Sequence, residues 1–194
     1  MNLAYPLEND DKVIIDGVEY QLDMSFDNIL RLFDLLEDRT INNVTKIEVG
    51  LRMLIDDTLD DYDIYQKADI FTEIFKQSIG VDNKKKQLVD LDGNPMPDIS
   101  EDDKKAFDLA QDAEYIYASF MHTYQIDLFE MQGKLHWKKF KALLNGLSED
   151  SIFSRVVGIR TAELPSGKGM QKERERLRKL KQKFALEEDD EDET

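Results

Sequence analysis

The 194-residue chain contains no cysteine and only two histidines, His122 and His136. Without thiols it can form no disulfide, no Cys-based zinc site and no thiolate nucleophile. Two imidazoles are too few for His-rich metal sites and for most His-dependent catalysis. The nine glycines and four prolines exclude a collagen-like or low-complexity chain. The composition therefore argues against most classes of enzyme.

Long apolar runs are also missing. No stretch approaches the roughly 18 to 20 apolar residues that a membrane helix needs. The first eleven residues lack a basic region followed by an apolar stretch, so they do not resemble a signal peptide. We expect the protein to remain in the compartment where it is made.

Charge is abundant and unevenly distributed. The formal net charge is -16, yet residues 168–183 carry a net +6, and residues 187–193 are seven consecutive carboxylates. An acidic body repels the phosphate backbone, because nucleic-acid affinity comes largely from counterion release by Lys and Arg. We therefore expect a basic or hydrophobic protein partner rather than nucleic acid.

Apolar periodicity predicts a mainly α protein with one N-terminal β-hairpin. Two short apolar runs flank Asp16-Gly17, a pair that tolerates the positive φ angles of a tight turn, so residues 13–22 form the hairpin. Ser25 is an expected N-cap, Thr45 and Glu48 have capping-box spacing, and Ser100 is the expected N-cap of a long central helix. Spacings of three and four residues predict helices over 25–37, 45–57, 63–79, 100–124, 134–146, 148–159 and 170–184.

The same patterns suggest a domain organisation. Residues 1–162 are expected to form one helical domain, in which residues 82–100 make an exposed loop or a short second hairpin. A flexible joint over 163–169 leads to a basic amphipathic helix over 170–186. The acidic tail, residues 187–194, is expected to be disordered because adjacent like charges repel.

Acidic clusters suggest metal sites only weakly. Asp90, Asp92, Asn94, Asp98 and Glu101 fall on positions 1, 3, 5, 9 and 12 of an EF-hand loop. However, Pro95 occupies the position that requires glycine, so a polar turn is the simpler interpretation.

Five aspartates, between residues 56 and 63, are better explained as a solvated junction between two helices. His136 next to Trp137 has neither a second histidine at helical spacing nor a cysteine to act with. The serines lack a Gly-x-Ser-x-Gly elbow, and residues 165–169 lack the spacing of a phosphate-binding loop. We expect no catalytic residues, no metal and no cofactor.

Two apolar features are candidates for partner binding. Trp137 and Phe140 belong to an aromatic group that could contact a partner, although their helical spacing favours core packing. We expect Trp137 to be largely buried. Leu177, Leu180 and Phe184 form a narrow stripe on the basic helix, which suits either partner binding or docking on the protein itself. We further expect this helix to be mobile and to be held off its partner by the acidic tail.

The second half of the chain contains a specific set of residues. They run from Asp112 through Tyr117, Phe120 and Tyr124, then Gly133 to Trp137, Phe140, Leu143-Leu144 and Gly146-Leu147, to Ile159-Arg160. With the N-terminal hairpin and Phe26-Asp27-Asn28, this set resembles a small tail-morphogenesis family of bacteriophages and prophages of Gram-positive bacteria.

The resemblance implies a tail assembly chaperone, because genes of that family typically lie between those of the major tail protein and the tape-measure protein. It implies a protein of the host bacterial cytoplasm that binds the tape-measure protein and recruits tail-tube protein. The alternative is a structural tail completion or connector protein of the virion. Because no catalytic constellation is found in the sequence, we expect no enzymatic activity, and self-association stays open.

Overall fold

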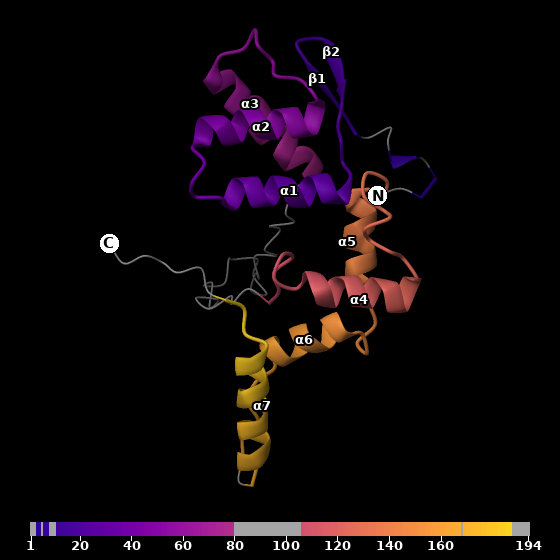
Figure 1. Cartoon of the computed structure of the whole chain (residues 1–194), viewed down its shortest axis with the longest axis vertical. Coiled ribbons are helices and arrows are strands. Elements are labelled where there is room, and N and C mark those ends of the chain that lie inside the picture. Colours follow the sequence, from indigo (N-terminus) through magenta and orange to yellow (C-terminus); the bar gives the residue numbers. More distant parts are fainter. Residues whose placement is uncertain (1–2, 5, 8–10, 80–105, 168, 188–194) are drawn as a thin grey trace, which may run out of the picture. The chain divides into compact units, whose positions relative to one another are not determined.

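The computed structural model describes residues 3–4, 6–7, 11–79, 106–167 and 169–187, and within them the chain is mainly helical (Figure 1). Seven α-helices and one antiparallel hairpin are present in these ranges, which confirms the predicted fold class. The loop or second hairpin expected over 82–100, the EF-hand-like pattern and residues 188–194 of the acidic tail lie outside the described residues. The elements are β1 (Lys12–Ile15), β2 (Val18–Gln21), α1 (Phe26–Glu37), α2 (Asn43–Ile55), α3 (Ile64–Ile74), a π-helical turn (Phe75–Ile79), α4 (Ala113–Tyr124), α5 (Trp137–Asn145), α6 (Ile152–Thr161) and α7 (Gln171–Lys183).

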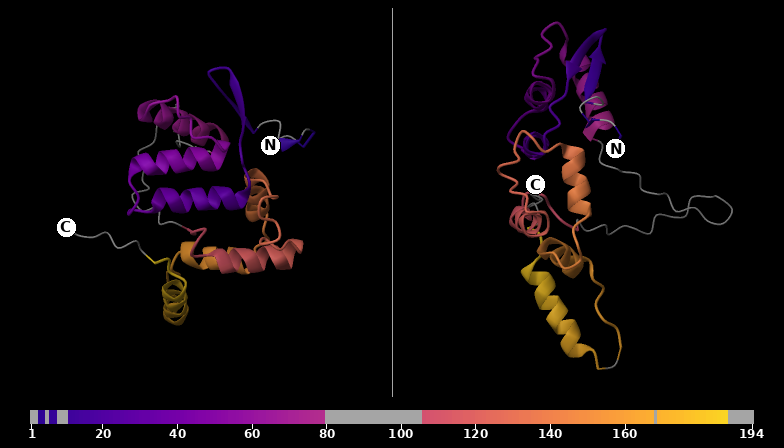
Figure 2. Two further views of the ribbon diagram at one scale, coloured as in Figure 1. Left: turned by 45° about the horizontal axis from the view of Figure 1, so that its top comes forward. Right: turned by 90° about the vertical axis from the view of Figure 1, so that its right-hand side faces the viewer.

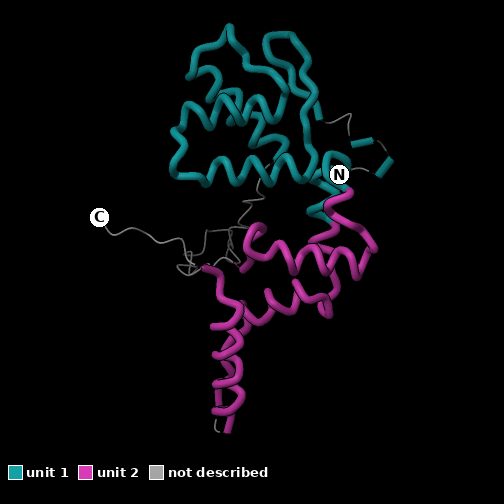
Figure 3. The backbone as a smooth tube through the Cα atoms, in the orientation of Figure 1, with its two compact units in different colours: residues 1–97, 131–142 teal, residues 98–130, 143–194 magenta. Residues whose placement is uncertain are grey.

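These elements fall into two compact units (Figure 3). Unit 1 consists of residues 1–97 and 131–142, and unit 2 consists of residues 98–130 and 143–194. The domain boundaries expected from the sequence stay a prediction.

The hairpin of unit 1 forms where it was predicted. β1 and β2 pair antiparallel with Ile15 opposite Val18 and Val13 opposite Tyr20. Asp16 and Gly17 both have positive φ, 47° and 84°. This is the backbone that a two-residue turn needs in order to match the twist of its strands, and it explains why Asp-Gly specifies the hairpin.

Three helices follow the hairpin, and their start signals differ in part from expectation. Ser25 is the N-cap residue of α1, as predicted, but its side chain bonds to Asp23 instead of capping the helix. The expected Thr45 capping box is wrong: α2 starts two residues earlier because the Asn42 side chain accepts from the backbone N–H of Thr45 at 2.9 Å. Asp63 caps α3 through a complete capping box.

The helices of unit 1 approach each other closely at Gly50. A Cβ atom added there would lie 2.7 Å from the ring of Phe71 on α3 and 3.3 Å from Leu32 on α1. Any larger residue at this position of α2 would therefore push two helices away. Glycine weakens a helix, and here it permits the close contact.

Aromatic rings from both chain segments of unit 1 fill its core. Phe26 stacks on Phe140 with ring centroids 5.1 Å apart, and Phe140 stacks on Trp137 at 5.6 Å. Phe33 meets Trp137 edge to face. The backbone N–H of Phe26 donates to the carbonyl of Leu135 at 2.8 Å. The segment 131–142 is thus built into the core of unit 1.

The helices of the second half start later than predicted. α4 begins at Ala113, so the expected helix from Ser100 is wrong over residues 106–112. In that stretch the Asp108 side chain accepts from the backbone of Ala110 and Gln111 and stabilises a turn instead of a helix.

The two later helices are shortened in the same way. Residues 134 and 135 form a turn closed by the carbonyl of Met131, and His136 forms an isolated β-bridge with Ser25, so α5 begins at Trp137. The N-cap of α6 is Ser151 rather than Ser148, since the Ser151 side chain accepts from the N–H of Ser154.

Unit 2 packs α4 on α6 around buried apolar residues. Phe120 is fully buried, and Ile116, Phe153 and Val156 are nearly so. Ser119 lies among them; its hydroxyl donates to the carbonyl of Tyr115 and accepts from the N–H of Phe153 at 3.1 Å. This hydroxyl therefore links α4 to the first turn of α6.

Candidate functional site: a basic helix held by a buried ion pair

The structure places the five predicted partner-binding residues in two environments. Trp137 is 4% exposed and Phe140 is 1% exposed, so both side chains belong to the core of unit 1, and the expected burial of Trp137 is confirmed. Leu177, Leu180 and Phe184 are half-buried along α7 and its C-cap in unit 2. Whether any of the five contacts a partner stays a prediction.

α7 presents a strongly basic surface. Its thirteen residues include seven Lys or Arg and two Glu, and none of its residues is buried. Lys179 pairs with Glu175 at 3.4 Å, but both side chains are more than 70% exposed, so this pair contributes little to stability. The apolar stripe faces the protein and five of the seven cations are exposed, whereas Arg174 and Lys181 are half-buried.

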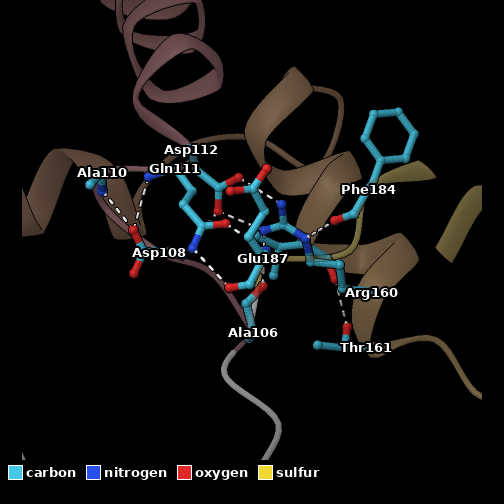
Figure 4. Close-up of polar contacts among 10 residues, drawn as sticks. Ala106, Asp108, Ala110, Gln111, Asp112, Arg160, Thr161, Phe184 and Glu187 are labelled. Atoms are coloured by element: carbon cyan, nitrogen blue, oxygen red, sulfur yellow. Dashed lines mark hydrogen bonds and ion pairs between the residues drawn. The ribbon is translucent and has the colours of Figure 1, made fainter. Parts of the chain in front are cut away.

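A buried guanidinium holds α7 in place (Figure 4). Arg160, on α6, forms two hydrogen bonds with the Asp112 carboxylate, at 2.6 Å and 2.7 Å. The two side chains are 10% and 1% exposed. Arg160 also donates through Nε to the carbonyl of Phe184, the C-cap residue of α7. Such a bidentate, largely desolvated pair fixes geometry as well as charge.

Further contacts fasten both ends of α7. Lys181 donates to the carbonyl of Arg160 at 2.8 Å, and Arg174 donates to the carbonyl of Pro165 at 3.1 Å. The ring of Phe184 meets Tyr115 of α4 edge to face at 6.2 Å.

The chain stays attached beyond α7. The backbone of Glu187 exchanges two hydrogen bonds with the side chain of Gln111 (Figure 4). The basic helix thus lies docked in unit 2, and its expected mobility stays a prediction.

An exposed apolar patch lies elsewhere on unit 2. Phe129 is 70% exposed and its ring lies 5.3 Å from that of Tyr117 on α4. Met121, one helical turn after Tyr117, is 38% exposed. Burial and then the neighbouring Asp127 carboxylate raise the pKa of Tyr117, so this ring is neutral at physiological pH. Apolar side chains grouped on an exposed surface are typical of protein contacts.

His136 forms a pair with Asp11 that is structural by its geometry. Nε2 of His136 lies 2.7 Å from the Asp11 carboxylate, and Nδ1 accepts from the backbone N–H of Lys138 at 2.9 Å. Because Nδ1 must accept, the proton of the neutral ring is on Nε2 and points at Asp11. Both nitrogens are thus engaged, which leaves none to take a proton from a substrate.

The aspartates between residues 56 and 63 have the helix-junction roles suggested by the sequence. Asp57 accepts from the backbone N–H of Leu59, and Asp63 caps α3. Asp56 ends α2 in the left-handed conformation. In the described ranges no three His, Asp or Glu side chains are grouped so that they could hold a metal ion. No described helix is both long and apolar enough to cross a membrane.

Residues 9–186 match the family model of the Bacteriophage Gp15 protein. The chain belongs to this family. Among curated proteins and among solved structures, no significant match was found. The Gp15 match includes the hairpin, all seven described helices and the buried Asp112–Arg160 pair.

Sequence reasoning on this Gp15 protein missed the most specific features of the site. Asp112 and Arg160 were noted only as two ends of the resembling residues, and the structure shows that they bind each other. Phe129 lies in a segment without helical spacing, so periodicity could not single it out. No local pattern in the sequence pairs Asp112 with Arg160, because they lie 48 residues apart.

Proposed function

We propose that this Gp15 protein is a phage tail assembly chaperone, which binds the tape-measure protein and aids tail-tube assembly. The observation that carries the proposal is the Gp15 family match over residues 9–186. It agrees with the tail-morphogenesis resemblance, whose gene order places the family beside the tape-measure gene.

Two surfaces of unit 2 support a role in holding a long partner. The outward face of α7 attracts acidic segments, and the Phe129 patch offers apolar contact. A chaperone for a long, aggregation-prone helical protein needs both kinds of contact, because it must cover apolar faces while it remains in solution.

The proposal is tested by co-expression with the tape-measure protein of the same phage. We expect the Gp15 protein to co-purify with the tape-measure protein, to raise its soluble yield, and to be absent from mature virions after sedimentation. Stoichiometric amounts in purified particles would show instead a structural tail completion or connector protein.

Surface variants sharpen this test. Phe129→Ser should reduce the co-purified tape-measure protein, whereas Val44→Ser, which changes a 49% exposed apolar side chain on α2, should not. The double change of Arg176→Gln with Arg178→Gln should weaken binding most at low salt, because exposed charges are screened as ionic strength rises. Equal recovery with all variants would show that unit 2 does not form the contact.

A further inference from the structure

Unit 1 contains a groove, separate from the basic helix and the Phe129 patch of unit 2. It measures about 480 Å³ and lies between the hairpin and α3, which run beside each other (Figure 2). One wall is the strand segment Val13–Ile15, and the other carries Asp69, Ile70 and Glu73 of α3. At the turn of the hairpin, the hydroxyl of Tyr62 donates to the Asp16 carboxylate at 2.7 Å.

The wall formed by β1 is the open edge of a sheet. The N–H of Leu22 donates to the carbonyl of Asp11 at 2.8 Å, and the two-residue turn pairs Ile15 with Val18. Since hydrogen-bonded and non-bonded positions alternate, the backbone groups of Lys12 and Ile14 point away from β2. In the described part of the chain this sheet has two strands, so the edge of β1 is unpaired there.

Beyond Lys12, whose charge is paired with Glu19 at 2.7 Å, the side chains of this edge strand are apolar. Natural edge strands are commonly shielded by charges, prolines or bulges. Here Ile14 is 70% exposed, and Ile70 across the groove is half-buried. An exposed aliphatic residue next to free backbone groups favours the addition of another strand.

The charge of the groove indicates which kind of strand could be added to β1. Asp16, Asp69 and Glu73 contribute carboxylates to the lining, and the lining contains no Lys or Arg. We propose that the groove binds an extended segment of a partner protein in which Lys or Arg alternates with aliphatic residues. The segment pairs with β1 as a third strand, with its cations toward Asp69 and Glu73. This proposal does not depend on the tape-measure role.

The ligand can be tested directly with the full-length protein. The probe is a fluorescein-labelled octapeptide of alternating Lys and Val, and binding is measured by fluorescence anisotropy. We expect saturable binding, which is lost when alternate amides of the peptide are N-methylated, because strand pairing needs the main-chain N–H groups. An octapeptide of alternating Glu and Val should bind at least tenfold more weakly.

Matched proline variants test the edge itself. Ile14→Pro removes a backbone N–H that faces the groove, and Gln21→Pro removes an outward N–H on the far edge of β2 without breaking the Lys12–Glu19 ion pair. We expect Ile14→Pro to weaken peptide binding about tenfold or more and Gln21→Pro to change it less than about twofold. If Ile14→Pro disrupts the fold by far-UV circular dichroism, the N-methylated peptide provides the same test from the ligand side.

Two matched double variants test the role of the carboxylates that line the groove. Asp69→Asn with Glu73→Gln should weaken binding at low salt, whereas Asp34→Asn with Glu37→Gln on exposed positions of α1 should not. Equal binding of the N-methylated peptide, or no saturable binding of the Lys-Val peptide in the millimolar range, would overturn the proposal. A dimer that dissociates in Ile14→Pro while the peptide fails to bind would assign the groove to a second copy of the chain.

Discussion

Removal of the Asp112 carboxylate should destabilise unit 2 strongly. Asp112→Ala leaves the guanidinium of Arg160 inside the protein with its two charged hydrogen bonds gone. Among the described residues, the hydrogen bonds that Arg160 keeps are those to the carbonyls of Phe184 and, at 3.4 Å, Ala106. An unpaired buried charge is costly because it has lost water without gaining a counter-charge.

The expected loss in the free energy of unfolding follows from the burial of both Asp112 and Arg160. For a pair that is 1% and 10% exposed, loss of one member costs about 3 to 5 kcal/mol. The carboxylate also accepts from the N–H of Asp108 at 3.0 Å, which adds about 1 kcal/mol. The double variant Asp112→Leu with Arg160→Met removes both charges, so it should cost less than the sum of the single changes.

Urea unfolding followed by far-UV circular dichroism measures these differences. Trypsin provides a second readout, because α7 must be released and unfold before the backbone beside its seven Lys or Arg can be cleaved. Lys179→Gln is the control: it breaks an exposed ion pair and should cost less than about 0.5 kcal/mol. If Asp112→Ala unfolds within about 1 kcal/mol of the parent and is cleaved no faster, the ion pair does not hold α7.

Three more predictions concern unit 1. Trp137→Ala should cost about 3 to 5 kcal/mol in urea unfolding because it empties a buried aromatic core, and an unchanged transition would show that the ring is dispensable. Gly50→Ala should lose about 1 to 3 kcal/mol through contact with Phe71, despite alanine's better helix propensity; higher stability would mean that the ring moves freely. The hydrogen bond to Asp16 raises the pKa of Tyr62 to about 12, so its stabilising contribution should be complete below pH 10 and lost as the pH rises toward 12. Asp16→Asn should lower that pKa in a phenolate absorption titration, and an unchanged titration would exclude the bond.

The sequence predicted those parts of the fold that depend on interactions between residues close together in the chain. The Asp16-Gly17 turn needs only two residues, and the helices follow from apolar spacing, so both were found from the sequence. Helix starts were less predictable because several side chains compete to cap the same stretch. Asp108 stabilises a turn where a helix was expected to continue, and Asn42 starts α2 ahead of Thr45.

The site was predictable only where it lies on one helix. The stripe of Leu177, Leu180 and Phe184 was visible in the sequence, as was the basic character of α7. The ion pair that holds α7 could not be predicted from the sequence. Arg160 and Asp112 are 48 residues apart, and no local pattern around either residue identifies the other as its partner. The groove between β1 and α3 likewise depends on packing between segments some fifty residues apart.

The two-segment construction of unit 1 has a consequence for the protein's synthesis. The hairpin and α1 to α3 leave the ribosome before Leu135, Trp137 and Phe140 have been translated. Until then Phe26 has neither its stacking ring nor the carbonyl that its backbone N–H reaches. A nascent chain of about 100 residues therefore exposes an incomplete aromatic core, and loop closure over more than 100 residues precedes the final packing. Folding of the first segment is thus coupled to translation of the second, and a fragment that ends before residue 131 should be prone to aggregate.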